Sequence, residues 1–183
     1  MSTLKTKEII NNHETNIKTI DWTKQHCGVH QASFKQLIEL MPDLECIKDS
    51  FPENVNEFTW DVKVHMLMPN QFPCIPNWHF DNVPRLNNKQ DFDAVKLDKH
   101  MYVWISNAPF TEFRKDGVNT LVEPKTWTKF TQKDEHRGTM SKDFQWRGFI
   151  RATHKDILPQ NKTGLNPYRR HSQVYLDSVN FSW

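Results

Sequence analysis

The sequence predicts a mainly β domain of the sandwich or barrel type, preceded by a helical section. After residue 57, roughly six to eight short segments with strand patterns are separated by turns rich in proline, asparagine and aspartate. No helical pattern alternates with these segments, which argues against a parallel α/β sheet. Only 5 glycines occur among the 183 residues, so asparagine and aspartate must form many of the turns.

Composition indicates one globular domain, residues 1–183, that is long enough to bury a core. Its 7 tryptophans and 12 phenylalanines supply bulky apolar surface, and the net charge of +2 neither requires nor excludes a nucleic-acid partner. The 3 cysteines are odd in number and far apart, which argues against a disulfide framework, and they form no Cys-x-x-Cys pair, which argues against a structural zinc site. Because neither an apolar leader nor an apolar run of membrane-spanning length is present, we expect a cytoplasmic protein.

Residues 1–50 form the predicted helical section. Within residues 21–46, four apolar side chains recur at the spacing of one helix face, namely Phe34, Leu37, Ile38 and Met41. Pro42 interrupts this pattern. We therefore expect a helix that ends near Pro42 and packs against the β domain.

Residues 57–153 hold the predicted β core, and the clearest strand pattern lies at 57–68. Even-numbered residues from Phe58 to Met68 are apolar, whereas the odd-numbered residues between them are mostly polar, which predicts one buried and one solvent-exposed face. Further extended segments are expected at 101–106, 110–113, 126–131, 136–140, 146–153 and 173–176. Alternating residues of 146–153 predict two faces, one with Arg147, Phe149, Arg151 and Thr153 and the other with Trp146, Gly148, Ile150 and Ala152. Loops or turns are expected at 85–99, 116–117, 141–145 and 157–167.

A histidine and a carboxylate lie two residues apart in the proline-stiffened segment 73–85. Residues i and i+2 of an extended chain project from the same face, so His79 and Asp81 would point into one space. Such a pair supplies two of the three protein ligands of a facial Fe(II) site. Taken alone, the pair favours an ordinary polar strand face, because His-x-Asp is common by chance.

Residues downstream complete a longer pattern. His136 is followed after ten residues by Arg147 and four residues later by Arg151, in a segment that ends Arg-Ala-Thr153. His-x-Asp, a distant His and an Arg at this spacing resemble the Fe(II)/2-oxoglutarate-dependent dioxygenases, with the motif pattern of taurine dioxygenase and phytanoyl-CoA hydroxylase-like members. The resemblance covers residues 57–153.

The resemblance implies a fold and an activity. The implied fold is a double-stranded β-helix of the jelly-roll or cupin-like type, with the helical section at 1–50, the core at 57–153 and a C-terminal extension at 154–183. The implied enzyme is an Fe(II)- and 2-oxoglutarate-dependent oxygenase that uses O2 to hydroxylate a substrate. The substrate class stays open between a small metabolite, a protein side chain and a modified nucleobase. Because the chain is short for this branch, we expect its substrate lid to be reduced or absent.

The same resemblance implies roles for six residues. The iron ligands would be His79, Asp81 and His136. The far carboxylate of 2-oxoglutarate would pair with Arg147, because an arginine offers a permanently charged, two-pronged partner. Arg151 would support that carboxylate or reach the substrate, and Thr111 would donate a hydrogen bond to the 2-oxoglutarate.

Two alternatives accompany this interpretation. His154 could be the distal histidine and Arg170 the carboxylate partner, although we prefer His136 and Arg147 because an arginine-bearing strand follows the His-Arg-Gly step. The second alternative concerns function, since the same scaffold could belong to a non-catalytic jelly-roll or cupin-like binding protein. Iron and 2-oxoglutarate binding would distinguish the enzyme from the binding protein.

Overall fold

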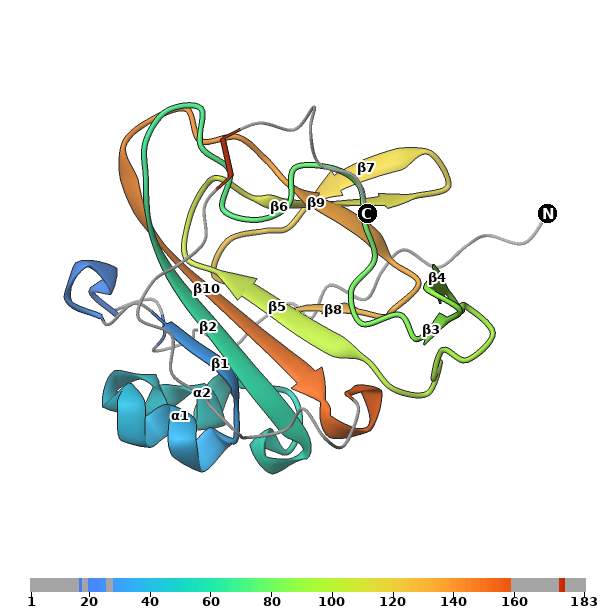
Figure 1. Cartoon of the computed structure of the whole chain (residues 1–183). Coiled ribbons are helices and arrows are strands. Elements are labelled where there is room, and N and C mark those ends of the chain that lie inside the picture. The colour runs from blue at the N-terminus through green and yellow to red at the C-terminus, as the bar shows by residue number, and fades with distance from the viewer. Residues whose placement is uncertain (1–16, 18–19, 26–27, 159–174, 177–183) are drawn as a thin grey trace.

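Figure 1 shows a mainly β structure built from two antiparallel sheets, with short helices beside the larger sheet. The computed structural model describes residues 17, 20–25, 28–158 and 175–176. Within this part of the chain, no helix has the length and apolar character needed to cross a membrane. The predicted mainly β class is confirmed, and the sheets are compatible with a β-sandwich.

The larger sheet has five strands and the smaller sheet has three. The larger sheet contains, in spatial order, β1 (Gly28–Ala32), β2 (Phe58–Leu67), β10 (Gln145–His154), β5 (Met101–Ile105) and β8 (Thr128–Phe130). The smaller sheet contains β7 (Val118–Leu121), β6 (Thr111–Lys115) and β9 (Glu135–Gly138). A separate small hairpin joins β3 (Arg85–Leu86) to β4 (Lys89–Gln90). All of these pairings are antiparallel.

The N-terminal section differs from the single helix predicted for 21–46. It contains α1 (Phe34–Leu40), α2 (Ile47–Ser50) and the short 3₁₀ turns Trp22–Lys24 and Pro42–Cys46, and strand β1 precedes α1. The helix prediction is wrong for the segment of β1, because β1 pairs with β2 along the sheet edge. Gly28 permits this pairing, since its φ is +144° and a Cβ there would lie 2.4 Å from the Val62 carbonyl oxygen.

A capping box at Ser33 fixes the start of helix α1. The Ser33 hydroxyl accepts a hydrogen bond from the Gln36 amide, and the Gln36 side chain accepts one from the Ser33 amide. Phe34, Leu37 and Met41 are buried, as the helical spacing predicted. They pack with Trp60 and Trp127 in a core between the helices and one face of the larger sheet.

Strand β2 corrects the prediction of one solvent-exposed face. Its polar residues Thr59, Asp61 and His65 are at most 3% exposed, because this face lies against the second sheet instead of water. On the apolar face that was predicted to be buried, by contrast, Met66 is 49% exposed. Buried polar side chains on a central strand require partners, and those partners belong to the candidate site.

A second core fills the space between the two sheets. Its buried members come from both sheets and the adjoining loops: Met101, Val103, Ile105, Phe113, Val122, Phe130 and Ile157. Strand β10 separates the two cores, with Ile150 and Ala152 in the first and Phe149 packed against the second. This division confirms the two faces predicted for 146–153.

The remaining predicted segments are largely present. Residues Asp116 and Gly117 have φ angles of 51° and 77° and form the turn between β6 and β7, as expected for a two-residue hairpin. The expected loop at 85–99 includes the small β3–β4 hairpin. Of the strand predicted at 173–176, Tyr175 forms a bridge with Phe72, while residues 173–174 lie outside the described residues. Most of the predicted loop 157–167 lies outside them as well.

Replacing Gly148 with alanine should destabilise the fold. A Cβ at this position would lie 2.2–2.4 Å from atoms of the Trp22 indole ring, which packs 5.9 Å from Trp104. Overpacking of this kind costs about 1–3 kcal/mol. We expect a lower midpoint of urea unfolding for the variant. In Gly117→Asn, where no atom lies within 4 Å and asparagine tolerates positive φ, the change should stay within about 0.5 kcal/mol. Equal midpoints for the two variants would contradict the predicted clash with Trp22.

Candidate metal centre

The segment that carries His79 lies alongside strand β9. The His79 amide donates to the His136 carbonyl oxygen at 3.0 Å, and the His136 amide donates to the His79 carbonyl oxygen at 2.9 Å. These two hydrogen bonds form an isolated antiparallel β-bridge, which joins the segment to the edge of the smaller sheet at β9. They place the two imidazole rings 4.5 Å apart, with Asp81 two residues further along the same segment.

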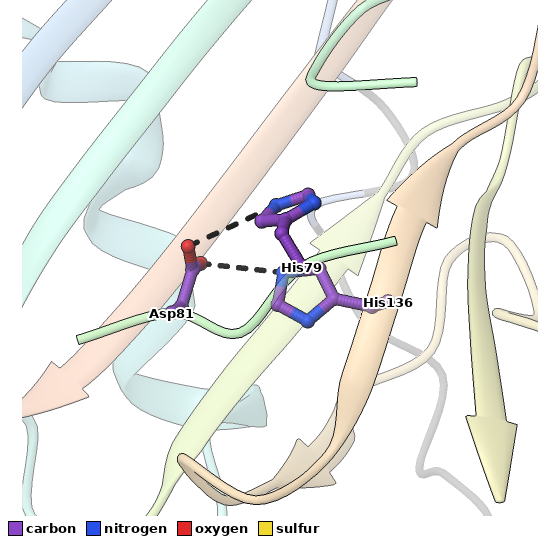
Figure 2. Close-up of side chains that lie close together, drawn as sticks. All are labelled: His79, Asp81 and His136. Atoms are coloured by element: carbon purple, nitrogen blue, oxygen red, sulfur yellow. Dashed lines mark ion pairs between the residues drawn. The ribbon is translucent and has the colours of Figure 1, made fainter. Parts of the chain in front are cut away.

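Figure 2 shows the side chains of His79, Asp81 and His136 converging on one space. The Asp81 Oδ2 atom lies 3.4 Å from His136 Nε2, and Asp81 Oδ1 lies 4.0 Å from His79 Nε2. All three ligand atoms lie within 4.8 Å of one another. Ligand atoms about 2.1 Å from a common ion lie roughly 3 Å apart, so small movements would close this set around a divalent metal.

The far nitrogens of both histidines are held by the backbone. His79 Nδ1 lies 2.8 Å from the Asn77 carbonyl oxygen, and His136 Nδ1 lies 3.0 Å from the Asp134 carbonyl oxygen. Since a carbonyl only accepts, each Nδ1 carries the proton and donates it, which leaves Nε2 of each ring as a lone-pair ligand. Metal-binding histidines are fixed in the same way.

The electrostatics of the site favour the protonation states that metal binding requires. Burial lowers the pKa of His79, and the neighbouring His136 lowers it further, so the imidazole of His79 is neutral near pH 7. Burial opposes ionisation of Asp81, but the charge of Arg151 and the contact with His136 outweigh it and hold the pKa of this carboxyl well below its ordinary value. A neutral imidazole and an ionised carboxylate can therefore face the metal without losing protons first.

Arg151 contacts two carboxylates. Its Nη1 donates to Asp81 Oδ2, while its Nη2 and Nε lie 2.8 and 3.2 Å from Asp61 Oδ2. Asp61 is 3% exposed and lies directly across from Arg151 in the register of β2 and β10. The sequence prediction missed Asp61, because it assigned the polar face of β2 to solvent. The signal available in the sequence was a charged residue in the middle of the clearest predicted strand.

Arg147 is buried and forms no ion pair with a carboxylate in the part of the chain that the structure describes. It is 1% exposed, its Nε donates to the Pro109 carbonyl oxygen at 2.8 Å, and its Nη2 has no hydrogen-bond partner among the described residues. Burial lowers the pKa of Arg147 to about 10. An isolated buried cation is costly, so this guanidinium is suited to receive an anion.

A cavity of about 80 Å³ lies beside the metal-type cluster, between the two sheets. His79, Asp81, His136, Arg151 and Thr111 all contribute to its wall. The Thr111 hydroxyl is buried and has no hydrogen-bond partner within the described part of the chain. The wall does not include Arg147, but the charge of Arg147 acts on Cys74, which does line the cavity.

An open groove of about 610 Å³ lies on the other side of the segment 75–85. Its wall includes Trp78, Phe80 and Asn82, and it shares His79 and Asp81 with the smaller cavity. The cluster therefore borders both the smaller cavity and the larger groove. A metal held there would be accessible from both.

The structure places the alternative distal histidine elsewhere. His154 lies at the end of β10, where its Nδ1 accepts a hydrogen bond from the Asp156 amide at 3.2 Å and its ring packs 5.4 Å from the Phe58 ring. Among the described residues, the cluster with metal-ligand geometry contains His136 and not His154. Arg170 lies outside the described residues.

In comparisons with known proteins, no protein-family model, curated protein or solved structure matches the chain.

Proposed function

We propose that this protein is a non-haem Fe(II)- and 2-oxoglutarate-dependent oxygenase that hydroxylates its substrate. The observation that carries the proposal is the convergence of His79, Asp81 and His136, with both Nε2 atoms facing the carboxylate. Two imidazoles and one carboxylate are the ligand set of facial Fe(II) sites, in which open positions remain for other ligands.

The order of the strands supports a double-stranded β-helix. After β2 in the larger sheet, the chain passes through the His79 segment beside β9, returns to β5, and forms β6 and β7 in the smaller sheet. It then forms β8 in the larger sheet, β9 in the smaller and β10 in the larger. Such alternation between two sheets is compatible with the winding of a jelly roll and supports that part of the proposal.

Two buried donors without partners support 2-oxoglutarate as the cosubstrate. The Nη2 of Arg147 and the Oγ1 of Thr111 both lack hydrogen-bond partners among the described residues. We propose that Arg147 binds the far carboxylate and that Thr111 donates a hydrogen bond to the 2-oxoglutarate, because hydrogen bonds to an ionised carboxylate are stronger than those between neutral groups. The cavity of about 80 Å³ has room for roughly five to eight waters, which is the scale of a small dicarboxylate.

The chain's own residues would bind, orient and shield the reacting groups. Bound Fe(II) and 2-oxoglutarate would supply the activation of O2. The ligands would be His79, Asp81 and His136, while the rings of Phe113 and Phe130, 5.2 and 5.6 Å from the His136 ring, keep water from that ligand. The substrate would approach from the open groove, whose wall already includes His79 and Asp81.

Anaerobic addition of Fe(II) and then 2-oxoglutarate tests the proposal. We expect one equivalent of bound iron and a weak visible charge-transfer band that appears only when both are present. Succinate release on admission of O2 would then show turnover. Absence of the band, together with absence of bound metal, would contradict the proposal and favour a binding protein that uses the same scaffold.

A further inference from the structure

Asp61, Arg151 and Asp81 form a continuous chain of charged groups at the metal-type cluster. Arg151 stands between the two carboxylates and uses all three of its guanidinium nitrogens on them. Each nitrogen of Arg151 therefore already donates to a carboxylate of the protein, in contrast to Nη2 of Arg147. The sequence led us to expect that Arg151 supports the cosubstrate or reaches the substrate, and these contacts add a role toward Asp81.

Asp61 is itself fixed from its other side. Its Oδ1 lies 2.6 Å from His30 Nδ1 and accepts a hydrogen bond from the Gln31 amide at 3.0 Å, while its Oδ2 faces Arg151. Gln31 has a φ of 49° at the irregularity in the pairing of β1 with β2, and this turns its amide toward Asp61. Both oxygens of Asp61 are thus occupied by donors, and the carboxylate cannot rotate without losing some of them.

We infer that the Asp61–Arg151 pair is a positioning brace that holds Asp81 in place for the metal. This inference rests on the proposed metal site. Arg151 occupies Asp81 Oδ2, so Oδ1 is the oxygen left to bind the ion. Binding through one oxygen instead of two keeps a position on the metal open for its other ligands.

The charge of Asp61 matters as much as its geometry. With Asp61 present, the single positive charge of Arg151 is shared between two carboxylates, and much of the negative charge of Asp81 remains available to a cation. Without it, Arg151 would be paired with Asp81 alone and would compete with the metal for that carboxylate. Outer partners of this kind change metal affinity by about 10–100-fold.

Metal titration of brace variants tests the inference. We expect Asp61→Asn to lower the affinity for Fe(II) about 10–100-fold under anaerobic conditions. Arg151→Lys should bind Fe(II) as weakly, because the single ammonium group of a lysine cannot hold two carboxylates in the fixed geometry of a guanidinium. The visible d–d spectrum of the Co(II)-loaded protein should also change in both variants, since its intensity reports the number of metal ligands. A purely structural role would not alter that spectrum.

A control and a second variant keep the outcome interpretable. The matched control is Glu112→Gln, which breaks an arginine–carboxylate pair of 2.7 Å with Arg137 in the smaller sheet and should leave metal affinity within about twofold of wild type. If Asp61→Asn fails to fold, the double variant Asp61→Asn/Arg151→Met removes both charges together and leaves no unpaired buried ion from this pair. We expect the double variant to lose affinity as well.

Three results would overturn the brace. The first is wild-type affinity in Asp61→Asn or in the double variant, and the second is wild-type affinity in Arg151→Lys. The third is an equal loss of affinity in Glu112→Gln, which would indicate a general effect of charge removal. A wild-type protein that binds neither Fe(II) nor Co(II) would instead contradict the proposed function itself.

Discussion

Replacing Asp81 with alanine should abolish Fe(II) binding while leaving the fold intact. Asp81 is the only carboxylate of the cluster, and the two remaining neutral imidazoles would offer the ion no charge. The loss should exceed the roughly 10–100-fold effect of removing an outer partner. The fold should survive because Arg151 keeps both of its hydrogen bonds to Asp61. Anaerobic calorimetry with Fe(II) measures the first effect, and thermal unfolding measures the second.

The control for this variant is Asp93→Ala, which removes an exposed carboxylate outside the cluster. It should bind Fe(II) as the wild type does, since isolated surface charges contribute little. If Asp81→Ala kept full iron affinity and 2-oxoglutarate turnover, Asp81 would not be a metal ligand. The cluster would then be an ordinary buried polar network.

Replacing Arg147 with glutamine should weaken 2-oxoglutarate binding by roughly two to three decades, while Fe(II) binding is spared. The loss of a buried, charge-assisted contact costs on the order of 3–5 kcal/mol. Titration of the charge-transfer band with 2-oxoglutarate under anaerobic conditions measures the change. Because Arg147 is buried without a carboxylate among the described residues, the variant without ligand should be no less stable than the wild type.

Thermal unfolding supplies a second measurement for the same variant. A ligand that binds only the folded protein raises its unfolding temperature, so 2-oxoglutarate with a divalent metal should stabilise the wild type far more than Arg147→Gln. In parallel, Arg170→Gln should leave the 2-oxoglutarate requirement unchanged. The opposite result, with Arg170 essential and Arg147 dispensable, would favour the assignment of His154 as the distal histidine.

Much of the fold could be predicted because periodicity is a local property. The alternation from Phe58 to Met68 and the two-faced pattern at 146–153 correspond to β2 and β10, the two longest strands. The segment 28–32 could not be predicted in the same way. Its five residues pair with β2 some thirty positions away, and a helical spacing nearby masked them.

The sequence by itself determined that His79 and Asp81 could face one metal ion, because His-x-Asp in an extended segment places both side chains on one face. Only the tertiary structure decided which charged side chains contact one another. Arg151 and Asp61 are separated by 90 positions, and their contact depends on the register of β2 against β10. Likewise, Arg147 and Arg151 occupy equivalent positions on one strand face, yet one meets two carboxylates and the other meets none among the described residues. Side-chain period reveals the face of a strand, whereas the neighbours on that face come from distant parts of the chain.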